Sequence, residues 1–446
     1  MVHTSKMFVI AGAALSLSGF AFAAESDTSR AYANELKADA AGRTSLAAGG
    51  KSSGLTITDG SGNFSMRIGG LMQFRYIANF RSGSTPNTTP VPATGGGVTG
   101  KDKATIGFSA PRTQLYFSGN AGSPEITYYI QGNFNSAGTG STTDGAFRLQ
   151  DAFVKYTFDN NWDVRWGQFK LPILAEDLIG DGYQQSVDRS TTANIFRQDR
   201  SQGIQVAYSA DVFRVLAAFS DGWRSLNTDF NNRAEADYAL TLRVDGKFAG
   251  DWNQWNQFSS WQNSQFAAFL GGAIHWQQGG STGDGADAVA NTNQTNFMLW
   301  TIDTQIKGNG WNVFGAFIGN HAKARNGGAT FNSYGWQIQG GFFATQQIEL
   351  FARYDGFYGS RQQGLVPRTF HFLDFGLNYY LFPESQTAKI SGDVLIGLTR
   401  SQGLQNTNFQ NTVPGGTNPL PDTLSGALGS PKSGEVSIRA QFQLLF

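Results

Sequence analysis

The chain has 446 residues, of which 56 are Gly, 13% are aromatic and only 15% are charged. Soluble domains usually carry about 25% charged residues and roughly 7% Gly, so the composition departs from that class in both respects. Lys and Arg together number 33, as do Asp and Glu. This zero net charge argues against a nucleic-acid partner, because such a partner requires a basic surface. Cys is absent, which excludes disulfides, thiolate metal sites and a thiol nucleophile.

The histidines do not indicate a metal or catalytic site. His275, His321 and His371 are scattered, and no two histidines have the i, i+4 spacing of a helical metal site. A hydrolase would need a positioned nucleophile and base, and no Ser or Asp stands at a spacing that indicates one. We therefore expect no catalytic residue, no metal and no cofactor, and predict that the chain is not an enzyme.

Residues 1–23 have the form of a secretory signal peptide. Lys6 precedes an apolar run at 7–17, and a small-x-small cleavage triplet follows at 21–23. No later run approaches the roughly 18 apolar residues that a membrane-spanning helix requires. The mature chain is therefore predicted to leave the cytoplasm. Residues 24–61 are expected to form a short periplasmic segment that ends in a Gly-rich turn.

From residue 62 onward, apolar and polar residues alternate, which is typical of β-strands with one apolar and one polar face. In the first run, Met72, Phe74 and Tyr76 alternate with Gln73 and Arg75. About 16 such strands are expected, at 62–80, 105–119, 124–135, 145–158, 162–170, 203–209, 212–220, 234–248, 264–278, 294–307, 310–320, 331–344, 347–358, 368–381, 387–400 and 432–446.

The connections between these strands alternate in length. Short links lie near 159–161, 209–211, 308–309, 345–346 and 383–385, and long ones at 81–104, 171–202, 277–293, 321–330 and 401–431. The link at 249–263 belongs to the short series but is longer, and it contains Trp252, Trp255 and Trp261. Short turns on one rim and long loops on the other are typical of bacterial outer-membrane barrels. We therefore predict an all-β fold, a transmembrane antiparallel β-barrel over 62–446, with short periplasmic turns and long extracellular loops.

Charged residues occupy one face of the predicted strands. A Lys or Arg facing lipid at the midplane would cost roughly 2–4 kcal/mol, so the charged face is predicted to line the lumen. The predicted lumen bases are Arg67, Arg75, Arg112, Lys155, Arg165, Arg214, Arg243, Lys247, Lys307, Arg353, Lys389 and Arg439, and the acids are Asp151, Asp163, Asp245, Asp303, Glu349, Asp355, Asp374 and Asp393. The predicted interfacial aromatics are Phe158, Trp162, Trp311, Tyr379 and Tyr380.

A closed ring of about 16 strands is too wide for its own side chains to fill, so it leaves an aqueous channel. The last strand alternates from Val436 to a terminal Phe446. That ending resembles the assembly signal of outer-membrane barrels, which implies the barrel assembly machinery as a partner, with outer-membrane lipid around the barrel.

Two stretches resemble the phosphate- and polyphosphate-selective porin family (porin O/P type). In the first, RWGQFKLP at 165–172 is followed by Glu176 and, after a loop, by GIQV at 203–206. In the second, ARYD at 352–355 is followed by GLNYYL at 376–381. The resemblance implies an outer-membrane homotrimer of 16-stranded barrels, each narrowed by an inward-folded loop and lined by basic residues.

The corresponding constriction here is the connection 171–202. It holds five acids and three bases, which departs from a strongly basic constriction: Glu176, Asp177, Asp181, Asp188, Asp199, Arg189, Arg197 and Arg200. We therefore expect a porin for passive diffusion of small hydrophilic solutes, with a mild preference for anions such as phosphate. The predicted pore-lining residues that attract anions are Arg67, Arg75, Arg112, Lys155, Arg165, Arg197 and Arg200.

Two alternatives stay open at this stage. Each basic residue could instead stabilise the barrel by pairing with an acid, as Asp151 with Lys155 and Asp163 with Arg165. The channel could also be non-selective or prefer carbohydrates, since the tryptophans of 249–263 could hold sugar rings; their placement at the membrane interface is the simpler interpretation.

Overall fold

The computed structural model describes residues 55–82, 103–134, 147–159, 161–223, 225–229, 236–279, 295–324, 330–359, 369–401 and 426–446. The predicted signal peptide, 1–23, and most of the predicted periplasmic segment lie outside these ranges, as do parts of the long connections.

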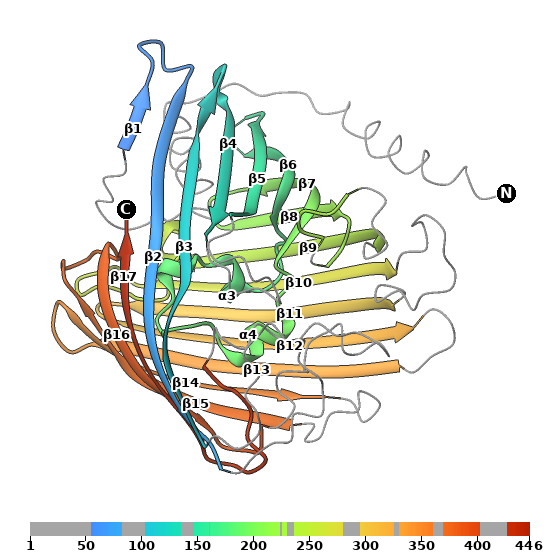
Figure 1. Ribbon diagram of the computed structural model, residues 1–446. Helices are drawn as coiled ribbons and strands as arrows, with labels where there is room; N and C mark the ends of the chain where they lie inside the picture. Colours follow the sequence, from blue (N-terminus) through green and yellow to red (C-terminus); the bar gives the residue numbers. More distant parts are fainter. Residues whose placement is uncertain are drawn as a thin grey trace.

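Strands β2 to β17 form a closed antiparallel barrel, in which each strand pairs with its sequence neighbours and β17 pairs with β2 (Figure 1). The predicted fold and its strands are thereby confirmed, with ends that differ by a few residues. The strands are β2 (Ser65–Phe80), β3 (Ala104–Ala121), β4 (Ser123–Asn133), β5 (Arg148–Thr157), β6 (Trp162–Lys170), β7 (Arg200–Ser209), β8 (Phe213–Ser220), β9 (Ala236–Ala249), β10 (Ala267–Gly279), β11 (Thr295–Gly308), β12 (Trp311–Ala324), β13 (Thr330–Phe343), β14 (Ile348–Tyr358), β15 (Thr369–Tyr380), β16 (Ala388–Gly397) and β17 (Glu435–Leu445).

One further strand precedes the barrel. β1 (Leu55–Thr58) pairs with Ser65–Ile68 of β2, ahead of the residues of β2 that pair with β17. The predicted Gly-rich turn joins the two, and the Asp59 carboxylate accepts a hydrogen bond from the Phe64 amide at 3.1 Å. The sequence analysis began the barrel after this strand, because four residues are too few to show an alternating pattern.

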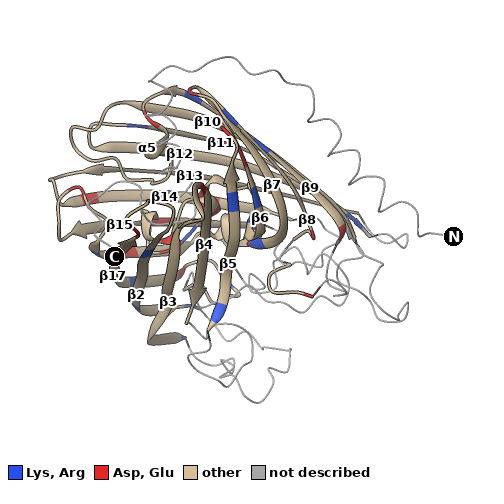
Figure 2. Ribbon diagram, turned by 90° about the horizontal axis from the view of Figure 1, so that it is seen from above, with Lys and Arg blue, Asp and Glu red and all other residues tan. Residues whose placement is uncertain are grey.

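The two faces of each strand differ as predicted. On β9, Leu240 and Leu242 are 52% and 43% exposed, whereas Arg243 and Asp245 are 0% exposed. An exposed apolar outer face is what contact with lipid requires. Figure 2 shows that Lys, Arg, Asp and Glu positions recur along the strands.

The predicted interfacial aromatics divide by the same alternation. Phe158, Trp162, Trp311 and Tyr379 are between 40% and 57% exposed on the outer face. Tyr380 was predicted wrongly: it is 0% exposed and donates a hydrogen bond to Glu349 Oε2 inside the barrel at 2.6 Å. Neighbouring residues on a strand point to opposite faces, so Tyr379 and Tyr380 cannot both face lipid.

Two connections fold into the barrel from opposite rims. One is residues 171–199, here called the inward loop, between β6 and β7. The other is residues 250–266, here called the inward turn, between β9 and β10; it carries the short helix α5 (Trp252–Trp255). Within the described ranges, no helix is long and apolar enough to cross a membrane.

Candidate pore constriction

The inward loop lies within the ring of strands, where the sequence analysis expected the constriction. It contains α3 (Ala175–Leu178), the 3-10 turn η1 (Asp181–Tyr183) and α4 (Thr191–Phe196) (Figure 1). Most of its side chains are buried against the barrel wall. A loop this densely packed is a fixed part of the lumen.

Asp188 attaches the inward loop to the first two strands of the barrel. Its carboxylate lies 2.8 Å from Arg75 Nη1 on β2 and 3.0 Å from Arg112 Nη2 on β3. Arg75 also donates to the Val187 carbonyl at 2.8 Å. Burial, the largest single effect, favours the neutral carboxyl, but Arg112 and Arg75 together hold the pKa of Asp188 well below its ordinary range. The carboxylate is therefore charged over the physiological pH range.

On the opposite side, hydrogen bonds attach the loop to β14, β15 and β16. Gln185 donates to Glu349 Oε1 at 2.7 Å. Ser186 donates to Asp374, and the Val187 amide donates to Asp393 Oδ2 at 3.0 Å. These contacts and those of Asp188 hold residues 185–188 across the seam between the last strands and the first ones.

A second set of polar contacts fixes the loop's own shape. Arg189 forms an ion pair with Asp181 and donates to the Ile179 carbonyl at 3.0 Å. Burial lowers the pKa of Arg189, but Asp181 and Asp177 outweigh it and raise that pKa above its ordinary value. Ser190 caps α4 by accepting from the Ala193 amide at 2.9 Å.

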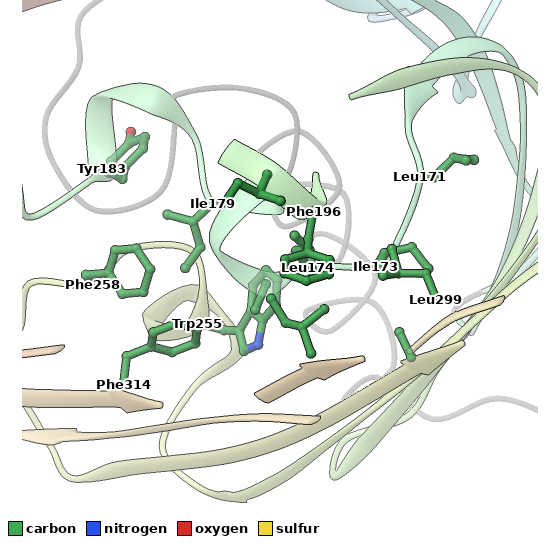
Figure 3. Close-up of a cluster of buried hydrophobic side chains, with 14 of the residues drawn as sticks. Leu171, Ile173, Leu174, Ile179, Tyr183, Phe196, Trp255, Phe258, Leu299 and Phe314 are labelled. Atoms are coloured by element: carbon green, nitrogen blue, oxygen red, sulfur yellow. The ribbon is translucent and has the colours of Figure 1, made fainter. Parts of the chain in front are cut away.

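The other side of the inward loop is apolar and packs on the inward turn. Figure 3 shows Leu174 and Ile179 of the loop close to Trp255 and Phe258 of the turn, with Phe314 of β12 beneath them. The rings of Phe258 and Phe314 are 5.0 Å apart. An apolar core thus fills part of the lumen beside β10 to β12.

Bases of the neighbouring strands hold the inward turn in place. The Arg214 guanidinium lies 4.5 Å and 4.2 Å from the ring centres of Trp252 and Trp255. Lys307 donates to the carbonyl of Gln254 at 2.8 Å and to that of Gln257. These two predicted lumen bases therefore face inward as expected, but they bind protein groups.

The tryptophans of this connection were expected either in an aromatic-lined loop or at the membrane interface. Trp252, Trp255 and Trp261 are instead 7%, 2% and 8% exposed inside the barrel. The interfacial interpretation is therefore wrong. Nothing in the sequence of a link on the short-turn rim indicates that it folds inward.

The seven predicted anion-attracting residues fall into distinct settings. Arg75 and Arg112 bind Asp188. Arg200 Nη2, at the start of β7, lies 2.8 Å from Asp151 Oδ2 on β5. Arg197 follows α4, and its carbonyl accepts from Trp223 Nε1 at 3.1 Å. Arg67 lies near the start of β2, opposite Thr56 of β1.

The two remaining residues of this set stand side by side. Lys155 on β5 and Arg165 on β6 are directly opposite in the strand register. Arg165 donates to Gln205 Oε1 at 2.6 Å, and its guanidinium lies 4.2 Å from the ring centre of Phe169. Like charges directly opposite each other on a sheet are destabilising unless something negative offsets them.

The exposure of inward-facing side chains differs between parts of the barrel wall. On β10, β11, β16 and β17, every described inward-facing side chain is buried. On β3 to β6, by contrast, several inward-facing residues are partly exposed, among them Ser118, Thr127, Thr157, Asp163 and Arg165. We call the inward-facing residues of β3 to β6 the open wall.

Sequence reasoning missed Lys170 and the role of Glu349. Lys170 ends β6 and donates to the Asp177 carbonyl at 2.6 Å; its place in the GQFK stretch is the signal that could have found it. Glu349 was assigned to the lumen, but its role in binding both inward segments has no sequence signal. Among the described residues, no group of three His, Asp or Glu side chains could hold a metal ion.

A model of the family described as phosphate-selective porin O and P matches residues 96–389, which is more than half of the chain. The chain belongs to this family. The match covers both stretches that carry the sequence resemblance, the inward loop and the inward turn. This porin therefore forms a channel in the outer membrane.

Solved structures of outer-membrane proteins share the fold. OmpT of Vibrio cholerae is 10% identical, with a TM-score of 0.52, and the match covers 87% of this chain and 100% of that one. The channel DcaP of Acinetobacter baumannii is 12% identical, with a TM-score of 0.52 and coverage of 87% and 99%. The anion-selective porin from Comamonas acidovorans is 12% identical, with a TM-score of 0.52 and coverage of 86% and 100%. No curated protein matches the chain significantly.

Proposed function

We propose that this porin is a diffusion channel for small hydrophilic solutes with a mild preference for anions such as phosphate. The observation that carries this proposal is the placement of Lys155 opposite Arg165 on the open wall. Both bases face the lumen, and Arg165 is partly exposed there. Basic groups in a pore attract anions and replace part of the anion's hydration shell.

The surrounding charges explain why the preference is mild. Asp163 lies on the same face of β6 as Arg165 and is also partly exposed. Asp181 of the inward loop lies 3.1 Å from Arg112 Nε. The field that a solute meets is the sum of these charges, and the acids reduce it without reversing it.

The experiment is the reversal potential of the protein in a planar bilayer under a salt gradient. We expect wild type to prefer anions, and Lys155→Ala with Arg165→Ala to reduce that preference. Lys323→Ala is the matched control, because Lys323 is exposed on the outer face of β12. A cation-selective wild type, or a double variant with unchanged selectivity, contradicts the proposal.

Phosphate itself is tested separately. Added phosphate should reduce the chloride current if it occupies the open wall, and this reduction should weaken in the double variant. The carbohydrate alternative is less well supported, because the tryptophans of the inward turn are packed against Arg214 and the inward loop. Block of the ion current by oligosaccharides would support the carbohydrate alternative.

We also propose a homotrimer and removal of residues 1–23 after export, as the family resemblance and the cleavage triplet imply. Unheated protein in mild detergent should migrate at about three times the monomer mass. The mass of the purified protein should place its first residue at Ala24.

A further inference from the structure

The inward turn is unlike the other connections of its rim. The neighbouring link from β11 to β12 takes only Asn309 and Gly310. The inward turn instead continues from β9 into α5 and then runs under the inward loop, where the Phe258 amide donates to the Tyr183 carbonyl at 3.4 Å. Its position inside the barrel therefore comes from specific contacts.

One carboxylate binds both inward segments. Glu349 of β14 accepts from Gln185 of the inward loop at 2.7 Å and from Ser259 of the inward turn at 2.9 Å. Asn378 of β15 also donates to Glu349, at 3.0 Å. The loop and the turn are thus joined at the wall as well as through their apolar core.

Inward-facing side chains on the two sides of the lumen differ in their exposure to solvent. Thr301 on β11 faces inward and is 2% exposed. Thr127 on β4 also faces inward but is partly exposed. The turn packs against this side of the wall: the rings of Trp252 and Phe269 of β10 are 5.8 Å apart, and those of Phe258 and Phe314 of β12 are 5.0 Å apart. We attribute the difference between the two threonines to this packing.

We infer that the inward turn is a second, fixed part of the constriction. It supports the inward loop from the short-turn rim, fills the lumen beside β8 to β12, and confines solutes to the open wall. This inference rests on the proposed channel function and adds the element that sets the width and position of the path.

The absence of Cys allows a direct test with single introduced thiols. Thr127→Cys and Thr301→Cys are near-isosteric changes at inward-facing positions. In a bilayer, a membrane-impermeant, negatively charged methanethiosulfonate reagent should modify Cys at 127 and reduce the current. Modification at 301 should be at least about tenfold slower, because it requires local opening. Equal rates at the two positions overturn the inference.

A second set of variants removes the packing of the turn. Trp255→Ala with Phe258→Ala should increase single-channel conductance and make Cys at 301 react, while Trp311→Ala on the lipid face should do neither. Heat-resistant migration of the unheated protein verifies that each barrel is folded. If the double variant is folded and leaves conductance and the 301 reaction rate unchanged, the turn does not confine the path.

Different results would refute the proposed anion preference and the proposed role of the inward turn. The thiol pattern depends on access alone, so it can hold in a channel that turns out to prefer cations. An anion-selective channel whose two thiols react equally would keep the proposed function and refute the role of the inward turn.

Discussion

The carboxylate of Asp188 in the inward loop lies 2.8 Å from the Arg75 guanidinium on the barrel's first long strand. Arg75 also donates to Gln441 of β17, at 3.0 Å from its Nε. A single guanidinium therefore joins the loop to both strands that close the ring. Both partners of the ion pair are fully buried, and removing one partner of a buried ion pair is strongly destabilising.

Replacing Asp188 should loosen the loop and change selectivity. Asp188→Asn leaves Arg75 and Arg112 without the carboxylate, and breaking a buried pair in this way costs about 3–5 kcal/mol. We expect a lower unfolding midpoint in detergent and a reversal potential shifted toward anions. Asp59→Asn, in the exposed turn before β2, is the control. A variant with wild-type midpoint and selectivity would show that the pair is dispensable.

The same pair predicts a pH dependence. The pKa of Asp188 is lowered in the folded protein from its ordinary value of 3.8. Its contribution to stability is therefore fully present above that value and is lost as the pH falls toward the folded pKa. The difference in unfolding midpoint between wild type and Asp188→Asn should be constant from pH 7 to about 5 and should shrink below 3.8. A difference that grows in acid is the opposite outcome.

Gly335 on β13 has no side chain, so helix α4 can pack closely against the barrel wall there. A Cβ at this position would lie 2.5 Å from Phe196 Cε2 and 2.6 Å from Thr192 Cγ2. Gly335→Ala should displace the helix and destabilise the protein by about 1–3 kcal/mol, as measured by its unfolding midpoint. Gly315→Ala is the matched control on β12, where the nearest atom would be 3.8 Å away. Equal midpoints for the two variants would refute the close contact.

Phe446 pairs the end of the chain with the early part of β2. Its amide and carbonyl exchange hydrogen bonds with Gly70 at 3.0 Å and 2.9 Å, and Tyr116 donates to the same carbonyl at 3.2 Å. Deleting Phe446 should reduce the amount of folded barrel in the outer membrane, since we predict that the assembly machinery recognises this residue. Tyr116→Phe removes only the hydroxyl contact and should leave that amount nearly unchanged. Equal loss in both variants would indicate a purely structural role for the residue.

The alternating pattern predicted the barrel well because lipid imposes it on every strand. Leu242 and Arg243, for example, could be placed on opposite faces from the sequence alone. Tyr380 was misplaced because aromatic residues near strand ends suit both a membrane interface and a polar lumen. Its hydroxyl reaches Glu349, a contact that depends on the register between β14 and β15.

The constriction was predicted less completely. The position of the inward loop followed from connection length and the family resemblance. The partners of its charges did not, because Asp188 meets Arg75 and Arg112 only after more than 70 intervening residues have folded into the wall. The length and the tryptophans of the inward turn marked it as unusual but did not show its inward course, since Trp255 and Phe258 find apolar partners on a loop from the opposite rim.

The attachment of residues 185–188 on both sides of the β17–β2 seam has a consequence for the order of folding. Arg75 and Asp393 belong to strands at opposite ends of the chain, and they become neighbours only once the ring has closed. The inward loop therefore cannot reach its final position in a half-formed sheet. Its full set of contacts forms only with the closed ring, so a complete constriction is evidence that the barrel around it is complete.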